Sequence, residues 1–120
     1  IRDRLYRIYP FLLYFEGRAG MSKKYTEIHV LKDRLREAGI PYEVQKANDG
    51  WQVGIPHLYP EESRISVIEH FASYGSAFDL LEIQFPDGEI RGFLKAETAF
   101  TLIQRIREKE HEKKEAENGK

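Results

Sequence analysis

The sequence contains no cysteine, one methionine and one tryptophan among its 120 residues. The lack of cysteine excludes disulfides, thiolate zinc sites and thiol nucleophiles, and it suits a reducing compartment. Basic residues (19) nearly balance acidic ones (20), so the formal charge of -1 gives no general attraction to nucleic acid or anionic lipid. No apolar run approaches the roughly 20 residues that cross a bilayer. We therefore expect a cytoplasmic protein with no membrane contact.

The single methionine, Met21, follows a short stretch with unusual coding potential. Residues 16–20 back-translate into purine-rich codons of the kind that form a bacterial ribosome-binding site. Two interpretations stay open: residues 1–20 are a translated leader before an initiator at Met21, or they are an N-terminal arm. The chain length leaves room for one domain. We expect that domain over residues 21–107, followed by a charged tail over residues 108–120.

Two helices are predicted by apolar residues that recur at steps of three and four. The first covers residues 25–38, with Ser22 as a plausible N-cap and Gly39 followed by Pro41 as a stop. The second begins at residue 95 or 96 and is amphipathic through Ile106. Residues 107–115 contain no apolar side chain. We expect them to form a solvated helical extension that frays within residues 116–120.

Between the helices the hydrophobic pattern changes to the twofold alternation of β-strands. Strands are predicted at residues 42–46, 51–55, 64–71, 80–85 and 89–94. The turn Asn48-Asp49-Gly50 tolerates positive φ and predicts a hairpin, whereas two prolines make residues 56–63 a loop. Short connections make the sheet antiparallel. The predicted fold is α+β: an antiparallel five-stranded meander flanked by an N-terminal and a C-terminal helix packed on one face.

The sequence has more large aromatic residues than one thin layer between sheet and helices readily hides. They are Tyr42, Trp51, Phe71, Phe78, Phe85 and Phe93. We therefore expect a homodimer that forms through the open face of the sheet or through the helices.

The densest group of potentially reactive side chains lies at residues 69–79, at one end of the two predicted central strands. His70, Ser73, Tyr74 and Asp79 are the candidates, because a histidine near hydroxyls and a carboxylate supports proton transfer or nucleophilic attack. The structural alternative is that any strand connection needs serine and glycine, and that His70 only satisfies a local backbone group. No known catalytic spacing is met, so we favour this alternative and assign no catalytic residue.

Trp51 is a further binding candidate, because it begins a strand beside the hairpin turn and an exposed indole is a common anchor. Packing of Trp51 in the core, or across the strands against Tyr42 or Val44, is the more frequent outcome. Asp79 and Glu82 are three residues apart and point to opposite faces, so they make a weak carboxylate pair. The histidines lack zinc-site spacing, and the glycines lack the pattern of a phosphate loop. We expect no metal and no cofactor.

Several short motifs resemble those of small uncharacterised proteins encoded by phages and prophages of Gram-positive bacteria. They are Ala38-Gly39-Ile40, His70, Ser73-Tyr74-Gly75, Leu80-Leu81-Glu82-Ile83, Gly92-Phe93-Leu94 and Ala96-Glu97. The likeness covers most of the chain from Met21 onward, and it departs at Ala72, where the pattern has glycine. It implies kinship with these proteins but no established activity.

Three functional hypotheses follow. The first is a non-enzymatic phage or prophage accessory protein that binds a host protein or itself and modulates a host or defence system. The second is a small-ligand or nucleotide-binding protein, or an enzyme, with a site at residues 69–79. The third, nucleic-acid binding, rests on basic residues of the first helix and ranks last because acidic neighbours dilute them.

Overall fold

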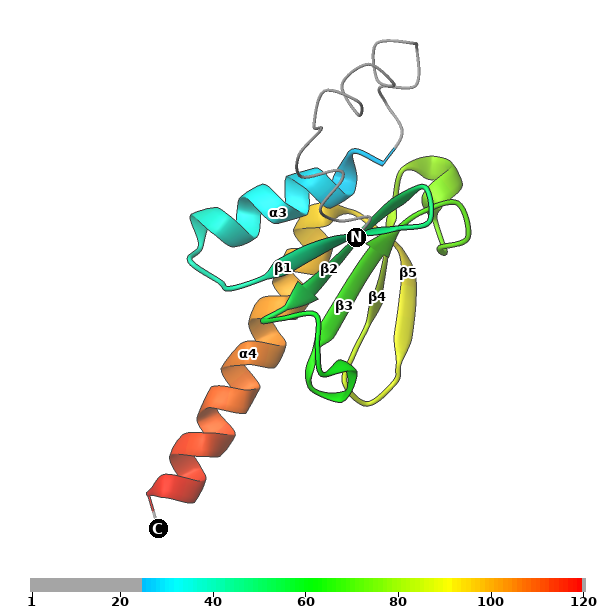
Figure 1. The fold of residues 1–120 in the computed structure, drawn as a ribbon. Helices are drawn as coiled ribbons and strands as arrows, with labels where there is room; N and C mark the ends of the chain where they lie inside the picture. The colour runs from blue at the N-terminus through cyan, green and yellow to red at the C-terminus, as the bar shows by residue number, and fades with distance from the viewer. Residues whose placement is uncertain (1–24, 120) are drawn as a thin grey trace.

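A computed structural model describes residues 25–119 of the chain. The helices are α3 (Glu27–Glu37) and α4 (Ala96–Asn118), and the short 3-10 turns are η2 (Glu61–Ser63) and η3 (Ser76–Phe78). The strands are β1 (Glu43–Ala47), β2 (Gly50–Ile55), β3 (Ile65–Glu69), β4 (Leu81–Gln84) and β5 (Ile90–Leu94). They form one antiparallel sheet in the order β1-β2-β3-β4-β5, as Figure 1 shows. The predicted α+β fold is confirmed.

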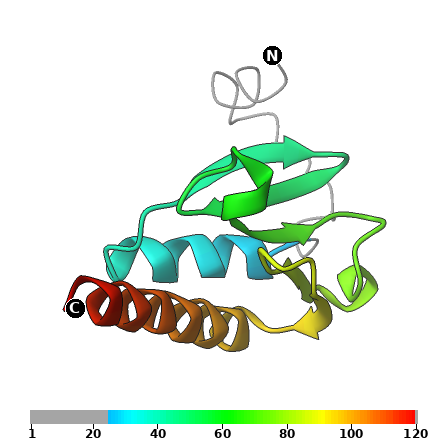
Figure 2. The same cartoon turned by 90° about the horizontal axis from the view of Figure 1, so that it is seen from below.

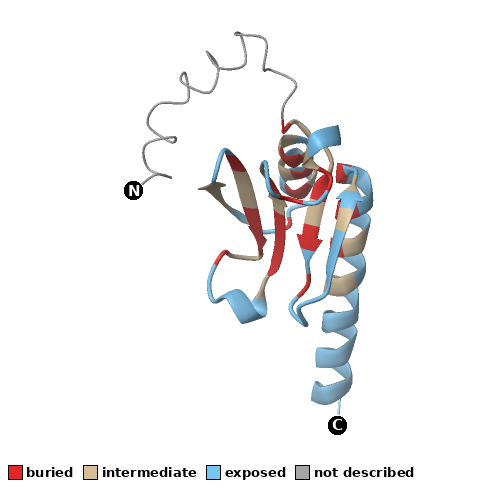
Figure 3. Cartoon of the chain, turned by 90° about the vertical axis from the view of Figure 1, so that its right-hand side faces the viewer, coloured by how far each residue is buried: buried red, intermediate tan, exposed pale blue. Residues whose placement is uncertain are grey.

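Both helices cover the same face of the sheet (Figure 2), where α3 packs on β2 and β3 and α4 packs on α3 and β4. The core lies in this interface (Figure 3). From α3, Ile28, Leu31 and Leu35 are fully buried, because steps of three and four place them on one side of the helix. Val53 and Val67 face them from the sheet. Burial of this one apolar stripe is the main force that holds α3 to the sheet.

The opposite face of the sheet carries a row of hydrogen-bonded polar side chains. Gln45 Nε2 donates to Gln52 Oε1 at 2.6 Å, and Gln52 Nε2 donates to Ser66 Oγ at 2.8 Å. The surplus aromatic residues therefore do not form an apolar layer on this face of the sheet. Phe85 belongs to the core, whereas Phe71 and Phe93 are exposed near the end of the sheet at which β3 ends and β4 begins.

Several predicted boundaries differ from those of the structure. The N-cap of α3 is Thr26, not Ser22, which lies outside the described residues, as does the suggested leader at residues 1–20. The third strand ends at Glu69 instead of continuing to residue 71, because the backbone turns back on itself immediately after Glu69.

The helix α4 also runs further than expected, to Asn118, where fraying was predicted from residue 116. Its last turns are exposed (Figure 3), and His111 Nε2 lies 2.9 Å from Glu115 Oε1, one turn away. Such pairs stabilise a solvated helix only slightly. Neither of the helices in residues 25–119 is long and apolar enough to cross a membrane.

Candidate functional site

The connection between β3 and β4, residues 70–80, is a compact turn that packs tightly on β5. A Cβ atom on Gly92 would lie 2.3 Å from Tyr74 Cβ, and one on Gly75 would lie 2.9 Å from Phe93 Cα. Phe93 N–H donates to the Tyr74 carbonyl at 3.2 Å. Glycine is therefore required on both sides of this contact, which fixes the connection against the strand.

The side chains of His70 and Ser73 form hydrogen bonds with backbone groups of this turn. Ser73 Oγ accepts a hydrogen bond from His70 N–H (3.0 Å) and donates one to the His70 carbonyl (2.8 Å). The ring atom His70 Nδ1 accepts from Ala72 N–H at 3.1 Å. The hydroxyl and the imidazole thus shape the local backbone, as the structural interpretation of the sequence predicted.

Tyr74 and Glu82 are also joined through the backbone. Tyr74 N–H donates to Glu82 Oε1 at 2.9 Å, while the Tyr74 ring is exposed. Asp79 instead accepts hydrogen bonds from the start of α3. The two carboxylates therefore do not form a shared site.

Asp79 caps the N-terminus of α3 across the fold. Its Oδ1 accepts Thr26 N–H at 2.7 Å and Glu27 N–H at 3.2 Å, and its Oδ2 accepts the Thr26 hydroxyl. Asp79 adopts φ 56°, a left-handed conformation that aspartate tolerates better than most residues. A helix begins with amides that have no partner within it, and a carboxylate there also complements the helix dipole.

Glu69 completes the same cap from the end of β3. It is 0% exposed, and its Oε1 accepts Ile28 N–H at 3.1 Å. Among the described residues no N–H or O–H group donates to Oε2, so an ionised Glu69 would bury an unsatisfied charged oxygen. A proton on Glu69 removes that charge and hydrogen-bonds to Asp79.

The pKa values of the two carboxyl groups accordingly move apart. Burial, reinforced by the hydrogen bond and negative charge of Asp79, raises the pKa of Glu69 to about 9. Burial also acts to raise the pKa of Asp79, but hydrogen bonds from Glu69, Thr26 and the amides of α3 outweigh it and lower that pKa. At neutral pH the pair therefore holds one proton, on Glu69.

Carboxylates join two further elements at this end of the fold. Asp49 Oδ1, in the β1–β2 turn, accepts Phe71 N–H at 2.9 Å, and Asp49 Oδ2 accepts the Tyr25 hydroxyl at 2.6 Å. Glu27 Oε1 accepts Ala96 N–H at 2.7 Å and so caps α4 from α3. The sequence placed Asp49 in a turn and Glu69 in the segment 69–79, but it did not predict these bonds or that of Glu27, because each crosses between distant segments.

Trp51 is half-buried on the helix-covered face of the sheet and packs against the core. This is the outcome that the sequence favoured. The Nζ atoms of Lys46 and Lys32 lie 4.7 and 5.6 Å from its ring centroid, and His29 meets it edge-on at 5.7 Å. Burial and the nearby charge of Lys32 lower the pKa of His29 to about 4, so this imidazole is neutral at pH 7. In the sheet, Trp51 pairs with Glu69.

Four exposed aromatic side chains define what we call the aromatic platform: Phe71, Tyr74, Phe78 and Phe93. They are 67%, 62%, 72% and 58% exposed, respectively. The rings of Phe78 and Phe93 lie 6.4 Å apart between centroids. The sequence predicted Phe71, Phe78 and Phe93 to be surplus to the core and named Tyr74 as a candidate. The contact of Phe78 with Phe93 depends on the irregular pairing of β4 and β5, where Phe93 takes φ 59°.

No group of three or more histidine, aspartate or glutamate side chains in residues 25–119 is arranged to hold a metal ion. Comparisons of the chain with protein-family models, curated proteins and solved structures found no match.

Proposed function

We propose that this protein is a non-enzymatic interaction module whose aromatic platform binds another protein. The observation that carries the proposal is the exposure of Phe71, Tyr74, Phe78 and Phe93, each more than half accessible. Grouped exposed apolar side chains are uncommon on monomeric proteins and mark interaction sites. Aromatic side chains also supply a large share of the binding energy at protein interfaces.

The platform rests on a backbone that is fixed before any partner arrives. The Gly75 and Gly92 contacts press the connection against β5, and Phe93 holds a positive φ that bulky residues rarely adopt. Backbone strain of this kind persists only where the surrounding structure enforces it, and it is concentrated at functional sites. A rigid platform loses less entropy on binding.

We further propose that the protein is a phage or prophage accessory protein that acts in the host cytoplasm on a host or defence protein. The support is the sequence resemblance, whose Ser73-Tyr74-Gly75 and Gly92-Phe93-Leu94 motifs form part of the platform and its contact with β5. A second copy of the chain is the alternative partner.

A ligand-binding or enzymatic site at residues 69–79 has one observation in its favour, the raised pKa of Glu69, because such shifts are concentrated at active sites. The position of Glu69 weakens that alternative. Its side chain is fully buried, and both it and Asp79 face the amides of α3. A structural cap accounts for the same shift.

The platform is tested by affinity capture with three versions of the protein: wild type, Phe78→Ser/Phe93→Ser, and Ile90→Ser as a matched control. Ile90 is an exposed apolar residue of β5 near the opposite end of that strand. Each captured protein is purified, and its affinity for the three versions is measured by calorimetry. We expect the double substitution to weaken binding by about tenfold or more and Ile90→Ser to leave it unchanged.

Equal affinity for all three versions would remove the platform as the contact surface. Light scattering on the isolated protein tests the other partner: a dimer that dissociates with Phe78→Ser/Phe93→Ser would identify a second copy as the occupant. Unfolding curves of the three versions check that the exposed substitutions leave the fold intact.

A further inference from the structure

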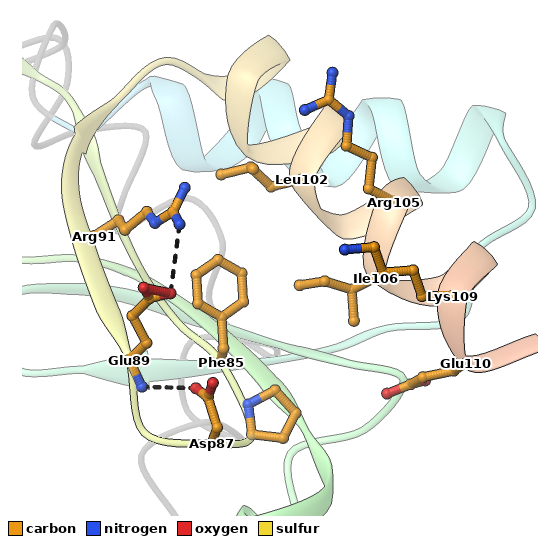
Figure 4. Close-up of a pocket in the computed structure, with 10 residues that line it drawn as sticks. Phe85, Asp87, Glu89, Arg91, Leu102, Arg105, Ile106, Lys109 and Glu110 are labelled. Carbon is orange, nitrogen blue, oxygen red and sulfur yellow. Dashed lines mark hydrogen bonds and ion pairs between the residues drawn. The ribbon is translucent and has the colours of Figure 1, made fainter. Parts of the chain in front are cut away.

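A groove separates α4 from the β4–β5 turn, near the end of the sheet away from the platform (Figure 4). It has a volume of about 540 Å³, within the range of sites for small organic ligands. Its apolar lining includes Phe85, which directly follows β4, and Leu102 and Ile106 of α4. The two helix residues are only half-buried, so the fold leaves part of this apolar surface uncovered.

Three cations stand around this apolar lining. Arg91 projects from β5, and Arg105 and Lys109 project from α4, one helical turn apart and therefore on the same side of the helix (Figure 4). Arg91 Nη2 lies 3.5 Å from Glu89 Oε2, and Arg91 Cζ lies 5.7 Å from the Phe85 ring centroid. Within residues 25–119, Arg105 and Lys109 take part in no ion pair.

In residues 25–119, none of the three acidic residues that line the groove forms an ion pair with Arg105 or Lys109. Asp87 Oδ1 accepts Glu89 N–H at 2.9 Å within the turn, and Glu89 pairs with Arg91. Glu110 is exposed on α4. The helix wall of the groove thus carries two positive charges on the same helix side, beside Leu102 and Ile106.

We propose that this groove binds a small amphipathic anion, with a carboxylate or phosphate group at Arg105 and Lys109 and an apolar tail on Phe85, Leu102 and Ile106. The tail covers the exposed apolar surface and removes it from water. The head group supplies a negatively charged partner for Arg105 and Lys109. The site is separate from the aromatic platform, so it does not depend on the function proposed for that surface.

The probe is decanoate at concentrations at which it remains monomeric, followed by calorimetry and by amide chemical shifts in NMR. Decyltrimethylammonium has a tail only one carbon longer than that of decanoate and the opposite charge, and butyrate has the same head group with a short tail. We expect decanoate to bind about tenfold more tightly than either control. Shifts should occur at residues 85–91 and 102–109.

The two cations are tested by Arg105→Gln and Lys109→Gln, with Lys113→Gln, one turn further along the exposed helix, as the matched control. Arg105, Lys109 and Lys113 are all exposed, so these substitutions leave the core intact. We expect the first two to weaken decanoate binding by about fivefold each and Lys113→Gln to leave it unchanged.

Equal binding of decanoate and decyltrimethylammonium would overturn the proposal. So would equal affinity of all three variants, or chemical shifts confined to the aromatic platform. Absence of decanoate binding at millimolar concentration would overturn it as well.

Discussion

Glu69 and Asp79 cap the same helix: their carboxyl oxygens accept the first backbone N–H groups of α3. Because Asp79 also directly follows η3, which carries Phe78 of the aromatic platform, this cap ties that part of the platform to the helix layer. The stability of α3 and the position of the connection are therefore coupled.

Replacement of Asp79 should destabilise the protein through this cap. Asp79→Ala leaves the amides of Thr26 and Glu27 without their acceptor, and we expect a loss of about 1–2 kcal/mol in the free energy of unfolding. Asp79→Asn should cost less, because asparagine keeps an acceptor and tolerates the left-handed backbone. Urea denaturation measures both, and equal stability of wild type and Asp79→Ala would show that the cap contributes nothing.

Stability should fall as the pH rises from about 6.5 to about 9. The folded-state pKa of Glu69 is about 9, above its ordinary value of 4.5, so the folded state holds a proton that the unfolded chain has lost. That contribution is complete below pH 4.5 and disappears as the pH approaches 9. His29 has the opposite sign but affects only the range between about 4 and 6.5. Unfolding free energies at several pH values measure the slope.

Glu69→Gln should flatten this slope, because the amide cannot ionise yet keeps an acceptor for Ile28 and a donor for Asp79. Glu43→Gln is the control, since Glu43 Oε1 also accepts a backbone amide, that of Leu58 at 2.8 Å, from an exposed position. A slope that persists unchanged in Glu69→Gln would contradict the protonated state assigned to Glu69.

Gly92→Ala should destabilise the protein by about 1–3 kcal/mol, because the added methyl group meets Tyr74 Cβ. Tyr74→Gly removes that Cβ and should recover part of the loss when both changes are combined. Gly88→Ala is the control for backbone strain alone, since Gly88 has φ 94° and nothing within 4 Å of the added atom. Additive effects of Gly92→Ala and Tyr74→Gly in a double-mutant cycle would argue against direct contact.

Removal of residues 111–120 should leave the unfolding free energy within about 0.5 kcal/mol of wild type. The last apolar residue of α4 that packs on the core is Ile106, and residues 111–119 are exposed. Circular dichroism should show less helix at an unchanged midpoint of unfolding. A marked fall in that midpoint would mean that the exposed part of α4 supports the domain.

Local patterns were sufficient to predict the elements of this fold. The steps of three and four that bury Ile28, Leu31 and Leu35, and the twofold alternation around Val53, depend only on the geometry of helix and strand. Gly39 ends α3 with φ 71°, and the Ile40 N–H closes the helix on the Leu35 carbonyl at 3.0 Å. Short connections then fixed the order of the strands.

The site was predicted less completely, because its contacts cross between segments that are distant in the sequence. The local bonds of His70 and Ser73 were foreseen as a structural possibility. The assignment of Asp79 to the start of α3 was not, since nothing near Asp79 in the sequence indicates which free amides it will meet.

The sequence by itself determined the α+β class, the meander and the covered face, because hydrophobic period and turn chemistry act over a few residues. Only the tertiary structure decided that Glu69 is buried beside Asp79 and protonated, because a carboxyl group's charge depends on the solvent and dipoles around it. The tertiary structure likewise decided that Phe78 and Phe93 meet outside the core, since their separation depends on how the β3–β4 connection packs on β5.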